Sequence, residues 1–216
     1  MTSQHLRLAA GAAVTAAALA ACGSGAASSG TGGVSGPAGS SPAGSSPAGT
    51  APAASFNAAD VAFATGMLRL RSQAQAMAGL VAGRTANGQL RRFAATVRSR
   101  EGDAQRMRGL MRQWDEPAPA PYVPGTAPPA GMGPGMMRGQ GWRQMVREHG
   151  SEFADHWLDV MIANRSAQIA LCRTELRSGT SPQARALARQ VLARRQAGLA
   201  QLRGMHHDRE HQGDHD

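Results

Sequence analysis

The sequence contains no lysine, one tyrosine and only two cysteines, and these shortages already exclude several classes of protein. All 23 basic residues are arginine, which together with abundant alanine and glycine is typical of a GC-rich genome. The formal charge of +9 alone would suit nucleic acid or anionic lipid. However, aromatic residues make up 4% of the chain, and no base-stacking motif is present. We therefore expect no nucleic-acid partner.

The sequence also lacks the common catalytic motifs. It contains no glycine-rich phosphate loop after a strand, no Cys-x-x-Cys pair and no convincing Ser-His-Asp order. Hydrolases need paired carboxylates or a nucleophile with a base, and Glu101 and Asp103, two residues apart, would diverge on a helix. Cys22 and Cys172 have separate explanations, so we expect no disulfide between them. We predict no catalytic residues and no enzyme activity.

Residues 1–21 have the pattern of a bacterial signal peptide. A short basic start precedes an apolar run from Leu8 to Ala21, which is too short to span a bilayer as a mature helix. The Leu-Ala-Ala before Cys22 resembles a lipobox, and this resemblance implies a lipid on the Cys22 thiol, cleavage before it and a membrane partner at the extracytoplasmic face. The alternative is an ordinary signal peptide or an uncleaved anchor. Cleavage removes Arg7 and leaves a charge of 9 − 1 = +8.

Residues 22–55 follow as a segment of Gly, Ser, Ala, Pro and Thr with almost no charge. Such a composition buries too little apolar area to offset the entropy of ordering. We expect a tether that holds the folded domain away from the membrane.

Residues 56–205 carry four apolar stripes with helical spacing. Asn57 is an N-cap candidate, Pro117 ends the second stripe and Pro182 suits a first helical position. Helices are expected over Asn57–Gly83, Gln89–Trp114, about Ser151–Gly179 (with an earlier start if Trp142–Glu148 adds a turn) and Pro182–Met205. The crossover, residues 117–141, is too rich in Pro and Gly for a regular element, and the His-rich tail, residues 206–216, is expected to fray. The fold class is all-α, a ferritin-like four-helix bundle of two similar hairpins joined by a long Pro/Gly/Met-rich crossover.

An internal repeat supports the two-hairpin architecture. The stretch Glu152–Leu176 matches the first helix after a shift of 165 − 71 = 94 residues. The shift aligns Trp157 with Phe63, Met161 with Met67, Arg165 with Arg71, Ser166 with Ser72 and Leu171 with Met77. An arginine therefore lies in the apolar stripe of the second copy.

The two matched helices resemble the family catalogued as domain of unknown function 305, which comprises exported bacterial ferritin-like bundles associated with copper. The resemblance covers about residues 56–205 and includes Asp60, Phe63, Met67, Leu68, Ala74, Met77 and Ala78, then Phe153, Trp157, Met161, Ile162, Ala163, Ile169 and Leu171. The family's paired histidines fall on Leu70 and Arg71 and on Asn164 and Arg165. Leucine cannot ligate a metal and a guanidinium repels a cation, so this site is degenerate.

Other residues could still bind a transition metal, and copper is the candidate cofactor. Thioethers suit Cu(I), although methionines on apolar stripes also serve as core filler. The candidates are Met67, Met77, Met107 and Met161 in the helices, Met132, Met136 and Met137 in the crossover, and His206, His207, His211 and His215 in the tail. His207 and His211 would share a face if the last helix continued. We interpret Cys172 as a buried inert thiol, and His149 and His156 as solvated side chains.

Two functions follow from these observations. The first is a membrane-anchored, extracytoplasmic, non-catalytic binding or interaction module with an unknown protein partner. The alternative is a copper-binding or copper-buffering protein that uses methionines, the crossover and the tail.

The two repeat arginines are expected at mid-height of the bundle. Arg71 and Arg165 must either pair with carboxylates, most plausibly Glu101 or Asp103, or extend to the surface.

Overall fold

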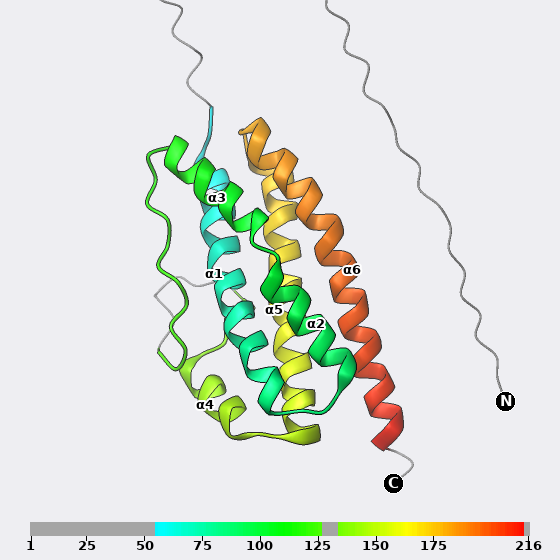
Figure 1. Ribbon diagram of the computed structural model, residues 1–216. Helices are drawn as coiled ribbons and strands as arrows, with labels where there is room; N and C mark the ends of the chain where they lie inside the picture. Colours follow the sequence, from blue (N-terminus) through cyan, green and yellow to red (C-terminus); the bar gives the residue numbers. More distant parts are fainter. Residues whose placement is uncertain (1–54, 127–133, 214–216) are drawn as a thin grey trace, which may run out of the picture. The chain divides into compact units, whose positions relative to one another are not determined.

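The computed structural model describes residues 55–126 and 134–213, which form a helical bundle without strands (Figure 1). The predicted signal peptide, Cys22, the tether up to residue 54, Met132 and His215 lie outside the described residues. Among the described helices, none has the length and apolar character that a membrane crossing requires.

Four helical columns make the bundle, as predicted. The first hairpin consists of α1 (Ala58–Leu80), extended by the 3₁₀ turn η1 (Val81–Gly83), and of α2 (Gly88–Ser99) with α3 (Gly102–Gln113). After the crossover come the short helix α4 (Gly139–Arg147) and the long helices α5 (Gly150–Ser178) and α6 (Pro182–Gly213). The helix α1 packs against α2, α3 and α5, and α6 packs against α5 and α3.

The start of α1 confirms the predicted cap. The Asn57 side chain accepts hydrogen bonds from the amides of Ala59 and Asp60, and the Asp60 carboxylate accepts one from the Asn57 amide. This capping box satisfies amides that the first turn leaves without helical partners. Asp60 also accepts from the amides of Thr180 and Ser181 at 3.1 and 3.0 Å, so the same carboxylate ties the α5–α6 loop to α1.

The predicted single helix Gln89–Trp114 is wrong, because it breaks into α2 and α3. Arg100 leaves the helical region with ψ 87°, and α3 begins at Gly102. The break allows Glu101 to accept hydrogen bonds from Arg71 and Gln75 while Asp103 faces Arg194 on α6. Ion pairs with other helices therefore accompany the interruption.

Two further boundaries differ from the prediction. The Trp142–Glu148 stretch belongs to the separate helix α4, where Trp142 and Met145 are buried, and not to an extra turn of the next helix. The tail does not fray at Met205, because α6 continues to Gly213. Ion pairs of His206 with Asp159 (3.0 Å) and of Arg209 with Asp155 (2.5 Å) hold its last turns against α5.

The core consists of two apolar clusters at opposite ends of the bundle. One includes Phe63, Met67 and Met107, and the other includes Met77 and Met161. Between the two clusters the helices bury polar side chains instead, and this layer contains the candidate site.

Candidate functional site

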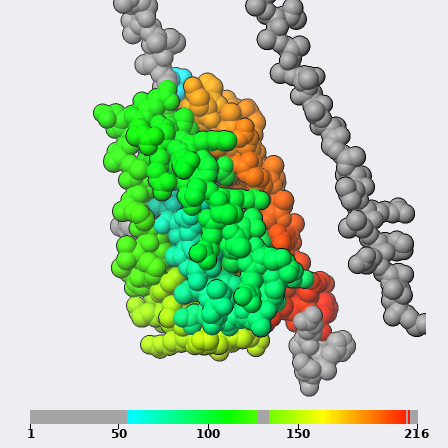
Figure 2. Space-filling view, in the orientation of Figure 1, coloured from blue at the N-terminus to red at the C-terminus, as the bar shows by residue number. Residues whose placement is uncertain are grey.

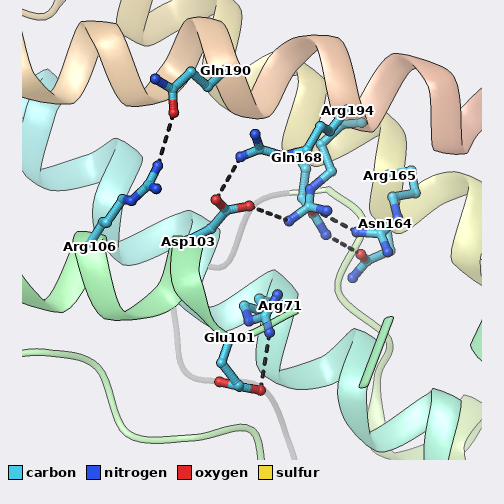
Figure 3. A network of polar contacts seen from close by, with 10 residues as sticks. Arg71, Glu101, Asp103, Arg106, Asn164, Arg165, Gln168, Gln190 and Arg194 are labelled. Atoms are coloured by element: carbon cyan, nitrogen blue, oxygen red, sulfur yellow. Dashed lines mark hydrogen bonds and ion pairs between the residues drawn. The ribbon is translucent and has the colours of Figure 1, made fainter. Parts of the chain in front are cut away.

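Polar side chains from three helices meet at mid-height between the two apolar clusters (Figure 3). We call this set the polar layer. Its buried members are Arg71 and Gln73 on α1, Asn164, Arg165 and Gln168 on α5, and Arg195 on α6. Asp103 and Arg194 flank it in Figure 3.

The polar layer lies where the internal repeat brings its two copies together. Asn164 Nδ2 donates a hydrogen bond of 3.0 Å to the carbonyl of Leu70, its equivalent in the repeat. Gln168 Nε2 donates in turn to Asn164 Oδ1 at 2.6 Å. All four positions of the degenerate histidine site are thus buried and adjacent, and they are filled by leucine, asparagine and two arginines.

Arg71 pairs with Glu101, as the sequence favoured. Arg71 is 5% exposed, and its Nη2 lies 3.1 Å from Glu101 Oε1. The Glu101 side chain is 49% exposed, so water also solvates this carboxylate. The pair satisfies one end of the guanidinium, whereas the buried Arg71 Nε has no hydrogen-bond partner within the described part of the chain.

Asp103 pairs with α6 and not with the repeat arginines. Its Oδ1 accepts from Arg194 Nη2 at 2.6 Å, and its Oδ2 lies 3.7 Å from Nη2 of Arg195. Arg195 is 4% exposed, and burial lowers its pKa to about 10 against the opposing effect of Asp103. Asp103 is therefore the anion that neutralises the α6 side of the polar layer.

Arg165 has no carboxylate within ion-pair distance among the described residues, which is the main departure from the expected pairing. Its Nη1 donates to Gln168 Oε1 at 3.0 Å, and its guanidinium carbon lies 5.9 Å from the Phe93 ring centroid. Burial, followed by repulsion from Arg195 and Arg71, lowers its pKa to about 9. The guanidinium is buried among like charges, which is an unusual arrangement for a structural arginine.

The candidate methionine ligands are dispersed. Met67 and Met107 lie in one apolar cluster, and Met77 and Met161 lie in the other, with the polar layer between the pairs. All four are fully buried core side chains. In the crossover, Met137 is buried in the second cluster, and Met136 is partly exposed.

The tail brings two predicted residues together. His207 and His211 lie one turn apart on α6, with their Nε2 atoms 3.2 Å apart. His206 pairs with Asp159, and His156 Nδ1 donates a 2.7 Å hydrogen bond to Glu148 Oε2. Within the described ranges, no group of three or more His, Cys, Asp or Glu is arranged to hold a metal ion.

The sequence did not reveal another site, a pair of buried carboxyl groups at one end of the bundle. Glu175 on α5 is fully buried beside Asp60, and burial raises its pKa to about 8. Its position three residues after the buried Cys172 was the available signal, because that spacing places both on one helix face. Burial also raises the pKa of the Cys172 thiol to about 12, which fits the predicted inert thiol.

Comparison with known proteins places this geometry in context. The family model described as Domain of unknown function (DUF305) matches residues 60–206. A protein from Streptomyces coelicolor, described as secreted, is 20% identical with a TM-score of 0.60, covering 70% of this chain and 92% of its own. A DUF305 fragment from Deinococcus radiodurans is 18% identical with a TM-score of 0.59, covering 70% and 97%.

A third solved structure, CopM in the Cu(II)-bound form, is 16% identical with a TM-score of 0.57 and covers 69% of this chain and 96% of its own. Identities this low establish a shared fold alone. A comparison with curated protein sequences found no match.

Proposed function

Because the chain belongs to the DUF305 family, we propose that it is a non-catalytic binding protein, held by a lipid on Cys22 at the extracytoplasmic face of the membrane, with a bundle core closed to metal cations. The observation that carries this proposal is the burial of Arg71 and Arg165, each 5% exposed, where family resemblance places histidines. A guanidinium remains protonated near neutral pH and repels a cation. The Asn164 amide is engaged with Leu70 and Gln168.

The lipid anchor is supported by the lipobox-like residues before Cys22 and by the secreted description of the Streptomyces coelicolor protein. We expect Cys22→Ala to move the full chain from the membrane fraction to the soluble fraction, because stable anchoring depends on the acyl chains. Fractionation in high salt, together with incorporation of labelled fatty acid, measures this effect. The matched control is Cys172→Ala, which removes the buried thiol and should leave the protein on the membrane. Membrane retention of the Cys22→Ala protein would contradict the anchor.

A second candidate function is copper capture at the surface, favoured by the His207 and His211 pair. Two nitrogens about 2.0 Å from one metal at tetrahedral or square-planar angles lie about 2.8–3.3 Å apart. The observed 3.2 Å between the two Nε2 atoms falls in this range. Neutral imidazole is a good copper ligand, and CopM, which has the same fold, is found with Cu(II). Because α6 continues through both residues, the pair is already formed on the helix.

Copper titration of the full chain tests both candidates. Outer-shell partners alone contribute about 10–100-fold to metal affinity, so His207→Gln with His211→Gln should lower Cu(II) affinity by more than about 100-fold. The matched control is His149→Gln, because His149 is an exposed histidine at the N-cap position of α5, where its side chain makes no capping hydrogen bond. Calorimetry measures affinity, and electron paramagnetic resonance reports nitrogen ligation.

The outcomes separate the two candidates. If the double variant still binds copper tightly, and continues to do so when His206, His215 and the crossover methionines are also replaced, the bundle core holds metal and the closed-core proposal fails. If the unmodified chain binds no copper, the second candidate fails and the first stands.

A further inference from the structure

A cleft of about 220 Å³ opens over the polar layer, and its walls are unusually rich in arginine. Residues of α1, α2, α5 and α6 line it, together with the residue that ends α2. Figure 2 shows one face of the bundle, on which α2 and α3 lie beside α6. The arginines of the cleft are Arg71, Arg100, Arg165, Arg194 and Arg195, and none of the lining residues is acidic.

The charges around the cleft do not balance. Five guanidiniums face two nearby carboxylates, Glu101 and Asp103, which leaves 5 − 2 = +3. Glu101 engages Arg71, and Asp103 engages the two α6 arginines, so Arg165 is left with the amide of Gln168 and the face of Phe93. Buried cations without a counter-ion are costly, and several of like sign in one place add repulsion.

The donors of these arginines are also incompletely used. The Nε atoms of Arg71 and Arg195 are buried without a hydrogen-bond partner in the described part of the chain. An unsatisfied buried donor destabilises a fold unless another group, such as a ligand, meets it. Guanidiniums present planar forks of donors that match the oxygens of phosphate and carboxylate.

We propose that this cleft binds a compact oxyanion of the phosphate class, held by Arg165 and Arg195 with Arg71 and Arg100 at its border. The anion supplies the missing negative charge and acceptors. Pockets for drug-sized molecules measure about 300–1,000 Å³, so a cleft of about 220 Å³ suits a smaller ligand. This inference rests on the proposed binding role and gives it a ligand class. In place of the cation site that family resemblance implies, the same layer is built for an anion.

Phosphate chemistry could come from free phosphate or from a lipid headgroup of the membrane that carries the protein. The test therefore uses two probes: inorganic phosphate, added to the full chain in a non-ionic detergent, and vesicles of phosphatidylglycerol, mixed with Cys22→Ala protein in detergent-free buffer. Calorimetry at constant ionic strength measures phosphate affinity. Flotation with vesicles, with and without added phosphate, measures headgroup binding by the Cys22→Ala chain, which lacks the acyl anchor.

Three single-charge variants make the measurement specific. Hydrogen bonds to charged groups are strong enough that Arg165→Gln should lower phosphate affinity at least about tenfold. Arg100→Gln changes an exposed residue at the edge of the cleft, so the variant should fold normally and its phosphate affinity should fall a few-fold. The matched control Arg91→Gln removes the same charge from an exposed position outside the cleft and should leave affinity unchanged.

Each result has one interpretation. Phosphate binding that Arg165→Gln weakens and Arg91→Gln preserves supports the cleft with free phosphate as the source. If the protein also binds the vesicles, if added phosphate releases it from them, and if Arg165→Gln abolishes this binding, a lipid headgroup is the source. Absence of phosphate binding, or an equal loss in Arg91→Gln, overturns the proposal. Either of these failures would leave the copper titration unaffected, so failure of this inference is distinguishable from failure of the closed core.

Discussion

Asp103→Asn is expected to lower the free energy of unfolding by about 3 kcal/mol, which is large for a change of one atom. Asp103 is the carboxylate closest to the buried guanidinium of Arg195, at 3.7 Å, and it also holds Arg194 at 2.6 Å. Asparagine keeps the shape and one acceptor but removes the charge. Arg195 would then join Arg165 as a buried cation without a counter-ion. Urea denaturation at neutral pH measures the loss.

Glu101→Gln is the matched control, because Glu101 lies two residues away and also pairs with a buried arginine. Its side chain is 49% exposed, whereas that of Asp103 is 12% exposed. Water already solvates the Glu101 end of its pair, and glutamine keeps an acceptor for Arg71, so the Glu101 variant should lose clearly less stability than the Asp103 variant. Adding Arg195→Met to Asp103→Asn should recover part of the stability, since the orphaned charge is gone. Equal losses in the two single variants would show that Asp103 does not neutralise the polar layer.

The architecture was predictable because it depends on features that one sequence records. The apolar stripes repeat with helical spacing, Asn57 and Pro182 mark two helix starts, and the internal repeat shows that the hairpins are equivalent. The stripes and the helix starts are local signals, the repeat needs only a comparison of the chain with itself, and each was confirmed. The break at Arg100 and the extension of α6 to Gly213 were missed, because they involve contacts with other helices.

The chemistry of the polar layer was only partly predictable. The repeat placed Arg71 and Arg165 at one height, and Glu101 was the partner expected for Arg71. Which arginine forms an ion pair with Asp103 depends on the rotation of α3 and α6 about their axes. No spacing in the sequence determines that rotation. Asp103 therefore faces Arg194 and Arg195, and Arg165 is the arginine left without a carboxylate. That imbalance of charge, invisible in the sequence, is what distinguishes the cleft.

The buried carboxyl pair at the end of the bundle predicts a pH-dependent stability. Asp60 and Glu175 are both fully buried. Burial works to raise the pKa of Asp60, but hydrogen bonds from the Asn57, Thr180 and Ser181 amides bring it below its usual value. Burial, and then the nearby Asp60 carboxylate, raise the pKa of Glu175 from 4.5 to about 8. Glu175 is thus the protonated member near neutral pH.

Glu175→Gln is expected to remove most of this pH dependence and to make the bundle more stable than the unmodified chain in alkaline solution. A raised folded pKa stabilises fully below the unfolded value of 4.5, and this contribution is lost as pH rises through about 8. Glutamine resembles the protonated carboxyl at every pH. The difference should be on the order of 2–4 kcal/mol above about pH 8, measured by urea denaturation from about pH 5 to about pH 9.

Comparison of variants isolates this carboxyl, because every other titratable group is common to the two proteins. Glu152→Gln, at an exposed position near the start of α5, is the control and should follow the unmodified chain at every pH. Gly179 lies directly against this carboxyl group, since a Cβ there would collide with Glu175 Oε1, so a larger residue at position 179 would displace the Glu175 side chain. If the Glu175→Gln curve runs parallel to that of the unmodified chain, Glu175 is already ionised in the fold, and Asp60 must then hold its charge beside a second buried anion.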